Sequence, residues 1–123
     1  MFFLLVAGSR TFWDYKLLCD KLDFFLKNKK EVTIVSGHCP HGADALAEKY
    51  AYERGIPLKL FPANWNKYGK RAGFVRNEEM HKFISNQKDR GVVLFWDGKS
   101  LGTKHSFSLA QKYNNKLKVV LFS

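Results

Sequence analysis

The sequence predicts an α/β fold in which a five-stranded, mainly parallel sheet lies between two layers of helices. Short apolar segments recur along the chain, segments with helical spacing of apolar residues separate them, and small polar residues follow several of the apolar segments. Strands and helices that alternate at this density form parallel sheets with right-handed crossovers. We therefore expect a single three-layer sandwich over residues 1–123, without a linker or an internal repeat.

Five apolar segments are the predicted strands, at residues 2–7, 32–36, 58–62, 91–95 and 117–122. Each is short and mostly continuous in apolar character, which is typical of strands that have both faces covered by helices. The first segment is too short to span a bilayer, and no basic region precedes it. We therefore expect a buried first strand and a cytoplasmic protein without a membrane partner.

Four helices are predicted between these strands, at residues 13–26, 42–55, 72–86 and 103–114. Thr11 or Asp14 can cap the amino end of the first helix with a side-chain oxygen. Gly55, followed by Pro57, ends the second helix, because glycine accommodates the turn and proline cannot continue the helix.

The composition indicates an ordered, strongly basic protein. A hydrophobic fraction of 46% excludes intrinsic disorder, and the formal net charge is +10. Such a charge attracts polyanions, either nucleic acid or a phosphorylated metabolite. The basic residues are nevertheless spread over several clusters, and lysines near helix ends are also favoured by the helix dipole.

Cys19 and Cys39 have neither metal-ligand nor redox spacing, so no metal site is predicted.

Glycine, serine and charged residues cluster where predicted strands meet helices, at residues 8–11, 36–38, 42–44, 97–98 and 102–103. The carboxyl ends of parallel strands share one edge of a sheet, so these clusters are expected to form one ligand site. Glycine turns let backbone N–H groups approach a phosphate, and helix amino ends favour negative charge. No cluster matches GxGxxG or GxxxxGK[ST], which argues against a standard dinucleotide or ATP loop.

The segment between the third strand and the third helix combines aromatic, cationic and amide side chains. Arg76 can bind phosphate or carboxylate oxygens through its guanidinium fork, and Trp65 or Tyr68 can stack on a base. In the alternative interpretation, the aromatic residues pack beneath the loop and Arg76 pairs with Asp44 or Glu79.

Four motifs occur in order along nearly the whole chain. They are Gly8-Ser9-Arg10, Ser36-Gly37-x4-Gly42-Ala43-Asp44, Trp65-x3-Gly69-x2-Ala72-Gly73-x2-Arg76-Asn77-x2-Met80, and Trp96-Asp97-Gly98-x3-Gly102-Thr103. Together they resemble the small YspA-like, YpsA-related branch of the SLOG superfamily. The resemblance implies a Rossmann-like fold with a site for nucleotides or nucleotide-derived ligands, in a group that is common in phages and mobile elements.

Phosphoribohydrolases of the same superfamily carry a PGGxGTxxE motif that binds phosphate and supplies a carboxylate. Residues 97–103 resemble its phosphate turn, and Arg76 resembles the helix arginine that completes the site. The carboxylate position falls on Ser106, which cannot stabilise the positive charge that develops as a glycosidic bond breaks. Asp44, Glu78 or Glu79 could replace it from another strand end.

We expect the chain to bind a nucleotide or a nucleotide-derived ligand, such as an ADP-ribose-type molecule, and to sense or sequester it. One alternative is a phosphoribohydrolase or N-glycosidase acting on a nucleoside monophosphate or NAD-like substrate, with Asp44 and Glu79 as candidate catalytic residues. The other is a nucleic-acid-binding module.

No cofactor is expected. Relatives with this fold often form dimers, and Phe74, Phe83 and Phe107 are the candidates for a homodimer interface.

The expected ligand contacts follow from these motifs. They are Gly8, Ser9, Arg10, Ser36, Gly37, Gly42, Asp44, Trp65, Arg76, Asn77, Asp97, Gly98, Gly102 and Thr103.

Overall fold

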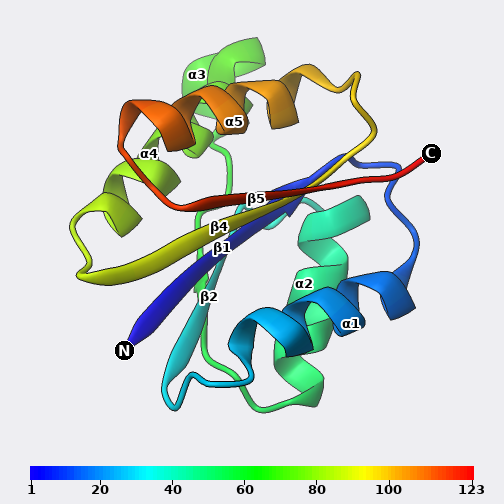
Figure 1. The fold of residues 1–123 in the computed structure, drawn as a ribbon. Helices are drawn as coiled ribbons and strands as arrows, with labels where there is room; N and C mark the ends of the chain where they lie inside the picture. Colours follow the sequence, from blue (N-terminus) through cyan, green and yellow to red (C-terminus); the bar gives the residue numbers. More distant parts are fainter.

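The computed structural model describes all residues from 1 to 123 and contains one five-stranded sheet (Figure 1). The strands are β1 (Phe2–Gly8), β2 (Val32–Ser36), β3 (Leu58–Leu60), β4 (Asp89–Trp96) and β5 (Leu117–Leu121). The helices are α1 (Tyr15–Leu26), α2 (Gly42–Glu53), α3 (Trp65–Tyr68), the 3-10 turn η1 (Gly69–Arg71), α4 (Ala72–Ser85) and α5 (Leu101–Lys112).

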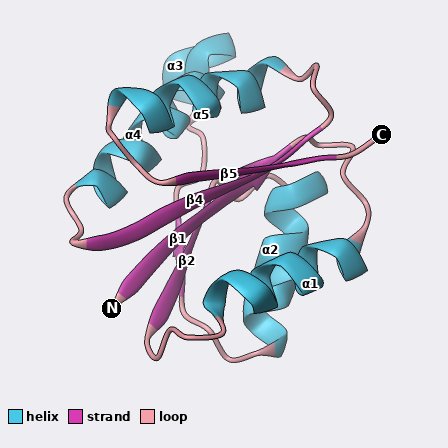
Figure 2. Ribbon diagram, in the orientation of Figure 1, coloured by secondary structure: helices cyan, strands magenta, loops and turns pink.

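The sheet is parallel throughout, with the strand order β3-β2-β1-β4-β5. Helices α1 and α2 cover one face, and α3, α4 and α5 cover the other (Figure 2). The chain first builds outward from β1 to β3 and then crosses back to β4, so the strand order reverses between β1 and β4. This arrangement confirms the predicted three-layer, Rossmann-like architecture.

Two hydrophobic cores fill the spaces between the sheet and its helical layers. Alternate residues of β1 point into different cores: Leu4 and Val6 face α1 and α2, whereas Leu5 and Ala7 face α4 and α5. Because both faces of β1 and β4 are covered, these strands have the continuous apolar character from which they were predicted.

The segment between β3 and α4 differs from the prediction. The sequence suggested a strand to residue 62 followed by a loop, but β3 ends at Leu60 and a short helix and a 3-10 turn precede α4. Asn64 starts α3 by accepting a hydrogen bond from the Lys67 N–H at 3.1 Å. At the first helix, Asp14 and not Thr11 provides the cap, accepting from the Leu17 N–H at 3.0 Å.

Two of the three phenylalanines considered for a dimer interface contribute to packing. Phe83 and Phe107 pack against the core beneath α4 and α5, whereas Phe74 is 44% exposed. Among the three, Phe74 is therefore the residue most available to a partner. No helix combines the length and the apolar character that a membrane crossing requires.

His81 is a buried titratable group on α4, beside the chain that follows α5. Its Nδ1 lies 3.5 Å from the side-chain amide nitrogen of Asn115, and its Nε2 has no hydrogen-bond partner. Burial, together with the nearby His105, lowers the pKa of His81 to about 4. The folded protein therefore holds this imidazole in its neutral form at neutral pH.

We predict that His81 destabilises the fold in acid. Between pH 6.5 and about 4 the unfolded chain binds a proton at this position that the folded chain does not, so stability falls as the pH drops through that window. The loss amounts to about 3 kcal/mol. Urea unfolding at pH 7 and pH 4 should show a smaller loss for His81→Gln than for the wild type. Equal losses would contradict this assignment.

Candidate functional site

A cavity of about 360 Å³ opens at the carboxyl ends of β1 and β4, where the strand order reverses. This is the position at which open parallel sheets bind their ligands. Ten of the residues predicted from the sequence line the cavity: Gly8, Ser9, Arg10, Asp44, Trp65, Arg76, Asn77, Asp97, Gly102 and Thr103.

Gly37 and Gly42 lie behind the cavity wall. A Cβ atom at Gly37 would lie 2.6 Å from Nη1 of Arg76, and one at Gly42, whose φ is +75°, would lie 2.3 Å from the Ser9 carbonyl oxygen. The two glycines therefore let Arg76 and the end of β1 take their places, and they do so without lining the cavity themselves.

Three other candidates also lie outside the cavity lining. Ser36 is buried and donates a hydrogen bond to Glu48 at 2.8 Å. Gly98 has a φ of +81° and forms the turn between β4 and α5. Glu79 is exposed on α4, so of the two candidate catalytic carboxylates only Asp44 faces the cavity.

The expected ligand contacts omit nine lining residues: Ala7, Thr11, Cys39, Lys70, Phe74, Gly73, Met80, Ser100 and Ser106. Of these, Thr11 belongs to the predicted cluster at residues 8–11, and Gly73 and Met80 belong to the third motif. Helical spacing could have revealed some of them. Gly73 and Met80 lie three residues before Arg76 and three after Asn77, on the same face of α4, and Ser106 lies three residues after Thr103 on α5.

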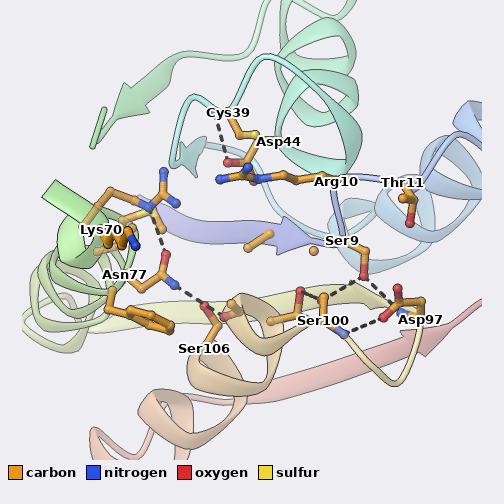
Figure 3. A pocket seen from close by; sticks show the side chains of 18 of the residues that line it. Ser9, Arg10, Thr11, Cys39, Asp44, Lys70, Asn77, Asp97, Ser100 and Ser106 are labelled. Atoms are coloured by element: carbon orange, nitrogen blue, oxygen red, sulfur yellow. Dashed lines mark hydrogen bonds between the residues drawn. The ribbon is translucent and has the colours of Figure 1, made fainter. Parts of the chain in front are cut away.

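Ser9 connects the ends of β1 and β4 (Figure 3). Its Oγ accepts a hydrogen bond from the Asp97 N–H at 3.1 Å and lies 3.1 Å from Oγ of Ser100. Its N–H donates to the Phe95 carbonyl oxygen at 2.9 Å. The hydroxyl of Ser9 thus makes its hydrogen bonds within the protein and holds the turn that leads into α5 in place.

Asp97 has a structural part in the same turn. Its Oδ1 accepts hydrogen bonds from the N–H groups of Ser100 and Lys99, both at 2.8 Å. These two hydrogen bonds lower the pKa of the Asp97 carboxyl. Asp97 lines the cavity, as predicted, but one of its oxygens is already committed to the backbone.

The amino end of α5 provides unoccupied donors at the cavity. The backbone N–H groups of Leu101, Gly102 and Thr103 have no acceptor within the protein. Ser100 does not cap them, because its side chain accepts no hydrogen bond from these N–H groups; its hydroxyl donates to Oγ1 of Thr103 at 2.8 Å. Free N–H groups and the positive end of the helix dipole together favour an anion at this position.

Arg76 is held in place by neutral acceptors. Its Nη1 donates to the Gly37 carbonyl oxygen at 2.6 Å and its Nε to Oδ1 of Asn77 at 2.9 Å, while Asn77 donates to the Gly102 carbonyl oxygen at 3.4 Å. Arg76 forms no ion pair with a carboxylate, contrary to the alternative in which Asp44 or Glu79 pairs with it. Its charge therefore remains available to a ligand.

Asp44 places a nearly buried carboxyl in the first turn of α2. Only 7% of the residue is exposed, and its Oδ2 accepts a hydrogen bond from the Cys39 N–H at 3.1 Å. Burial raises its pKa to about 6, although that hydrogen bond and the charges of Arg76 and Arg10 act in the opposite direction. In Figure 3 the side chains of Arg10 and Asp44 point toward one another.

Aromatic side chains border the cavity on the side of α3 and α4. Trp65 is 52% exposed and Phe74 is 44% exposed. Gly73 lies between Trp65 and Arg76, and a Cβ atom there would be 3.8 Å from the indole and 3.6 Å from Nη2 of Arg76. The absence of a side chain at Gly73 keeps the space beside both groups open.

These features define a Rossmann-like domain with a polar, cation-rich cavity at the switch point of its sheet. The chain belongs to the YspA, cpYpsA-related SLOG family, whose model matches residues 3–68. Membership of this family indicates a nucleotide-ligand-binding type of Rossmann-like domain.

A phage relative agrees with this assignment, and a solved structure shares the fold. The chain is 31% identical over 115 residues to the Gene 61 protein of Mycobacterium phage D29, covering 89% of this chain and 88% of the phage protein. The C-terminal domain of a hydrogenase from Pyrococcus furiosus has the same fold, with a TM-score of 0.53 and 15% identity over 96% of this chain and 90% of that domain. The phage relative agrees with the association with phages that the motifs implied.

We predict opposite effects of alanine at two glycines that line the cavity. At Gly8 a Cβ atom would lie 2.2 Å from the Phe95 carbonyl oxygen and 2.8 Å from Cβ of Ala43, whereas at Gly102 it would meet no atom within 4 Å. Gly8→Ala should therefore destabilise the protein by about 1–3 kcal/mol or more. Gly102→Ala should leave stability unchanged or raise it by up to about 1 kcal/mol. Thermal unfolding measures both, and a well-tolerated Gly8→Ala would refute the close approach of β1, β4 and α2.

Proposed function

We propose that the cavity binds a nucleotide or a nucleotide-derived ligand, such as an ADP-ribose-type molecule, and senses or sequesters it without converting it. The main support is the set of unoccupied donors at the amino end of α5, which faces a cavity that also holds the guanidinium of Arg76, a cation without an ion pair. Both features favour a phosphate group, the part that all such ligands share.

In this proposal the phosphate lies against the turn from Gly98 to Thr103. Gly102 is exposed and has open space where a side chain would be, so a ligand can approach its backbone closely. Lys99 and Lys104 are exposed on the same turn and helix and add positive charge. Arg76 would bind the phosphate with Nη2, which has no hydrogen bond to the protein.

The remaining parts of the ligand would use the other walls. A base can stack on Trp65 or Phe74, whose rings are partly exposed at the cavity. Asp44 can accept a hydrogen bond from a ribose hydroxyl with the oxygen that Cys39 leaves free. The cavity volume of about 360 Å³ is near the lower end of the range of about 300–1,000 Å³ for small-molecule sites, which favours a ligand about the size of one nucleotide.

Asp44 also supports the alternative function, a phosphoribohydrolase or N-glycosidase. A carboxyl that lines a cavity and has its pKa raised to about 6 is suited to general acid or base catalysis. Ser106, which stands at the position of the phosphoribohydrolase carboxylate, is buried and carries no charge. The alternative therefore depends on Asp44, because Asp97 is committed to its turn and Glu78 forms an ion pair with Lys112 at 3.3 Å.

The fate of the ligand separates the two functions. We would incubate the purified protein with AMP, ADP-ribose and NAD and analyse the mixtures by chromatography. Complete recovery of a bound compound supports sensing or sequestration. Release of a free base or ribose phosphate by the wild type, but not by Asp44→Asn, would establish the hydrolase instead.

We further propose that the protein acts in the cytoplasm as a homodimer. Phe74 offers an exposed aromatic surface on α4 beside the cavity mouth, so an interface there would lie next to the ligand. Light scattering on the wild type and Phe74→Ser tests this arrangement, and a monomer at micromolar concentrations in both proteins would argue against it.

We predict that Arg76→Ala weakens ligand binding at least tenfold, because hydrogen bonds to charged groups contribute about 1.5–3 kcal/mol. Calorimetry with AMP, ADP-ribose and NAD measures the change for whichever compound binds the wild type. Arg71→Ala is the matched control, since Arg71 is exposed on η1 and does not line the cavity.

Gly102→Val should also weaken binding, by placing a branched side chain over the phosphate position. Unchanged affinity in both Arg76→Ala and Gly102→Val would refute the phosphate site.

We predict that Asp44→Asn stabilises the protein at pH 8 but not at pH 4. The pKa of this carboxyl rises from 3.8 to about 6 on folding, so the folded chain binds more protons in that window and stability falls as the pH rises through it. This rise in the pKa of Asp44 lowers the free energy of unfolding by about 3 kcal/mol at pH 8, relative to pH values below 3.8. Asparagine keeps an oxygen for the Cys39 N–H. Thermal unfolding at both pH values should show the gain only at pH 8, and a loss of stability there would contradict the prediction.

A further inference from the structure

A second cavity, of about 570 Å³, lies at the opposite, amino edge of the sheet. It runs along the first residues of β1, β4 and β5 and is bounded by Phe25 of α1 and by the turns that precede β4 and β5. We call it the amino-edge groove. None of its residues lines the carboxyl-edge cavity.

The topology explains why this groove is open. Helices α1 and α2 accompany the strands from β1 out to β3, and α4 and α5 lie on the other face (Figure 1). On the side of α1, Val93 and Phe95 of β4 pack into the core, whereas the first residues of β4 and β5 line the open groove. At the carboxyl end Phe12 fills this space by packing on Phe95 and Phe122, but no comparable residue fills it at the amino end.

The groove is strongly basic. Lys29, Lys88, Lys116, Lys118 and Arg90 line it, against one acidic residue, Asp89. None of the five basic side chains forms an ion pair with a carboxylate. Three chain segments that are far apart in the sequence thus bring unpaired positive charge to one place.

Hydrogen bonds within the protein fix the side chain of Arg90 in the groove. Its Nε donates to Oδ1 of Asn115 at 2.6 Å, and its Nη1 donates to the Gln87 carbonyl oxygen at 2.8 Å. Both acceptors are neutral, so they hold the guanidinium in position without neutralising it. The floor beside these charges is apolar and includes Phe2 and Phe25, and the Lys29 ammonium lies 4.5 Å from the ring centroid of Phe2.

We propose that the amino-edge groove binds single-stranded nucleic acid. Single-strand sites combine basic side chains that contact phosphates with aromatic and apolar surface that contacts unstacked bases. The groove has both in one cavity. A duplex keeps its bases stacked inside and could use only the lysines, so the apolar floor favours a single strand.

Fluorescence anisotropy with a labelled 20-nucleotide oligo(dT) and with a duplex of equal length tests the proposal. We expect saturable binding of the single strand, weaker binding of the duplex, and an affinity that falls as salt increases. The triple variant Lys88→Glu/Lys116→Glu/Lys118→Glu should bind the single strand about tenfold more weakly, or worse, at low salt. In a plot of the logarithm of the binding constant against the logarithm of salt concentration, its slope should be less steep by about two, because each phosphate contact to a single strand contributes about 0.7 to that slope.

A second triple variant, Lys59→Glu/Lys67→Glu/Lys82→Glu, is the matched control. It changes the net charge by the same amount, but its exposed lysines lie on β3, α3 and α4 and line neither cavity. It should lose much less affinity than the groove variant. Equal losses in the two triple variants, preference for the duplex, or absence of binding at low salt would each overturn the proposal.

Discussion

The hydrogen bonds of Ser9 hold together the three parts of the chain that form the carboxyl-edge cavity. Its N–H binds the end of β4, its carbonyl oxygen accepts from Phe12 and from Ala43 at the start of α2, and its hydroxyl accepts from Asp97 in the turn to α5. This arrangement requires glycine at position 8, because a side chain there would overlap the backbone of Phe95. The positions of both helix amino ends at the cavity depend on this junction.

The cavity holds charged groups of both signs that form no ion pairs with one another. Arg76 is bound by neutral oxygens, and Asp44 is buried within the influence of two arginines without forming an ion pair with either. Uncompensated charge in a partly buried site is unfavourable in the absence of a ligand. A ligand that supplies phosphate to the arginine and a hydroxyl to the carboxylate would give both groups a partner. Binding would then remove part of the free-energy cost that these unpaired charges impose on the ligand-free fold.

The fold could be predicted from the sequence because the buried strands are nearly continuous apolar runs and the turns carry glycine and polar residues. Residues that directly follow a strand, such as Ser9 and Arg10, line the cavity as expected. The sequence does not show which way a side chain points or what binds it: Glu79 lies one residue before Met80 on α4 yet is exposed, and one oxygen of Asp97 accepts hydrogen bonds from its own turn. The short helix at Trp65 was missed because four residues show too little periodicity.

Strand β4 begins at the amino-edge groove and ends at the carboxyl-edge cavity, and its central residues are buried on both faces. Eight residues of extended chain span roughly 25 Å at about 3.3 Å per residue. A packed strand of this kind acts as a rigid spacer between its two ends. Because the two cavities share no side chain, substitutions can alter one of them without disturbing the other, and the two surfaces can therefore diverge independently among related chains.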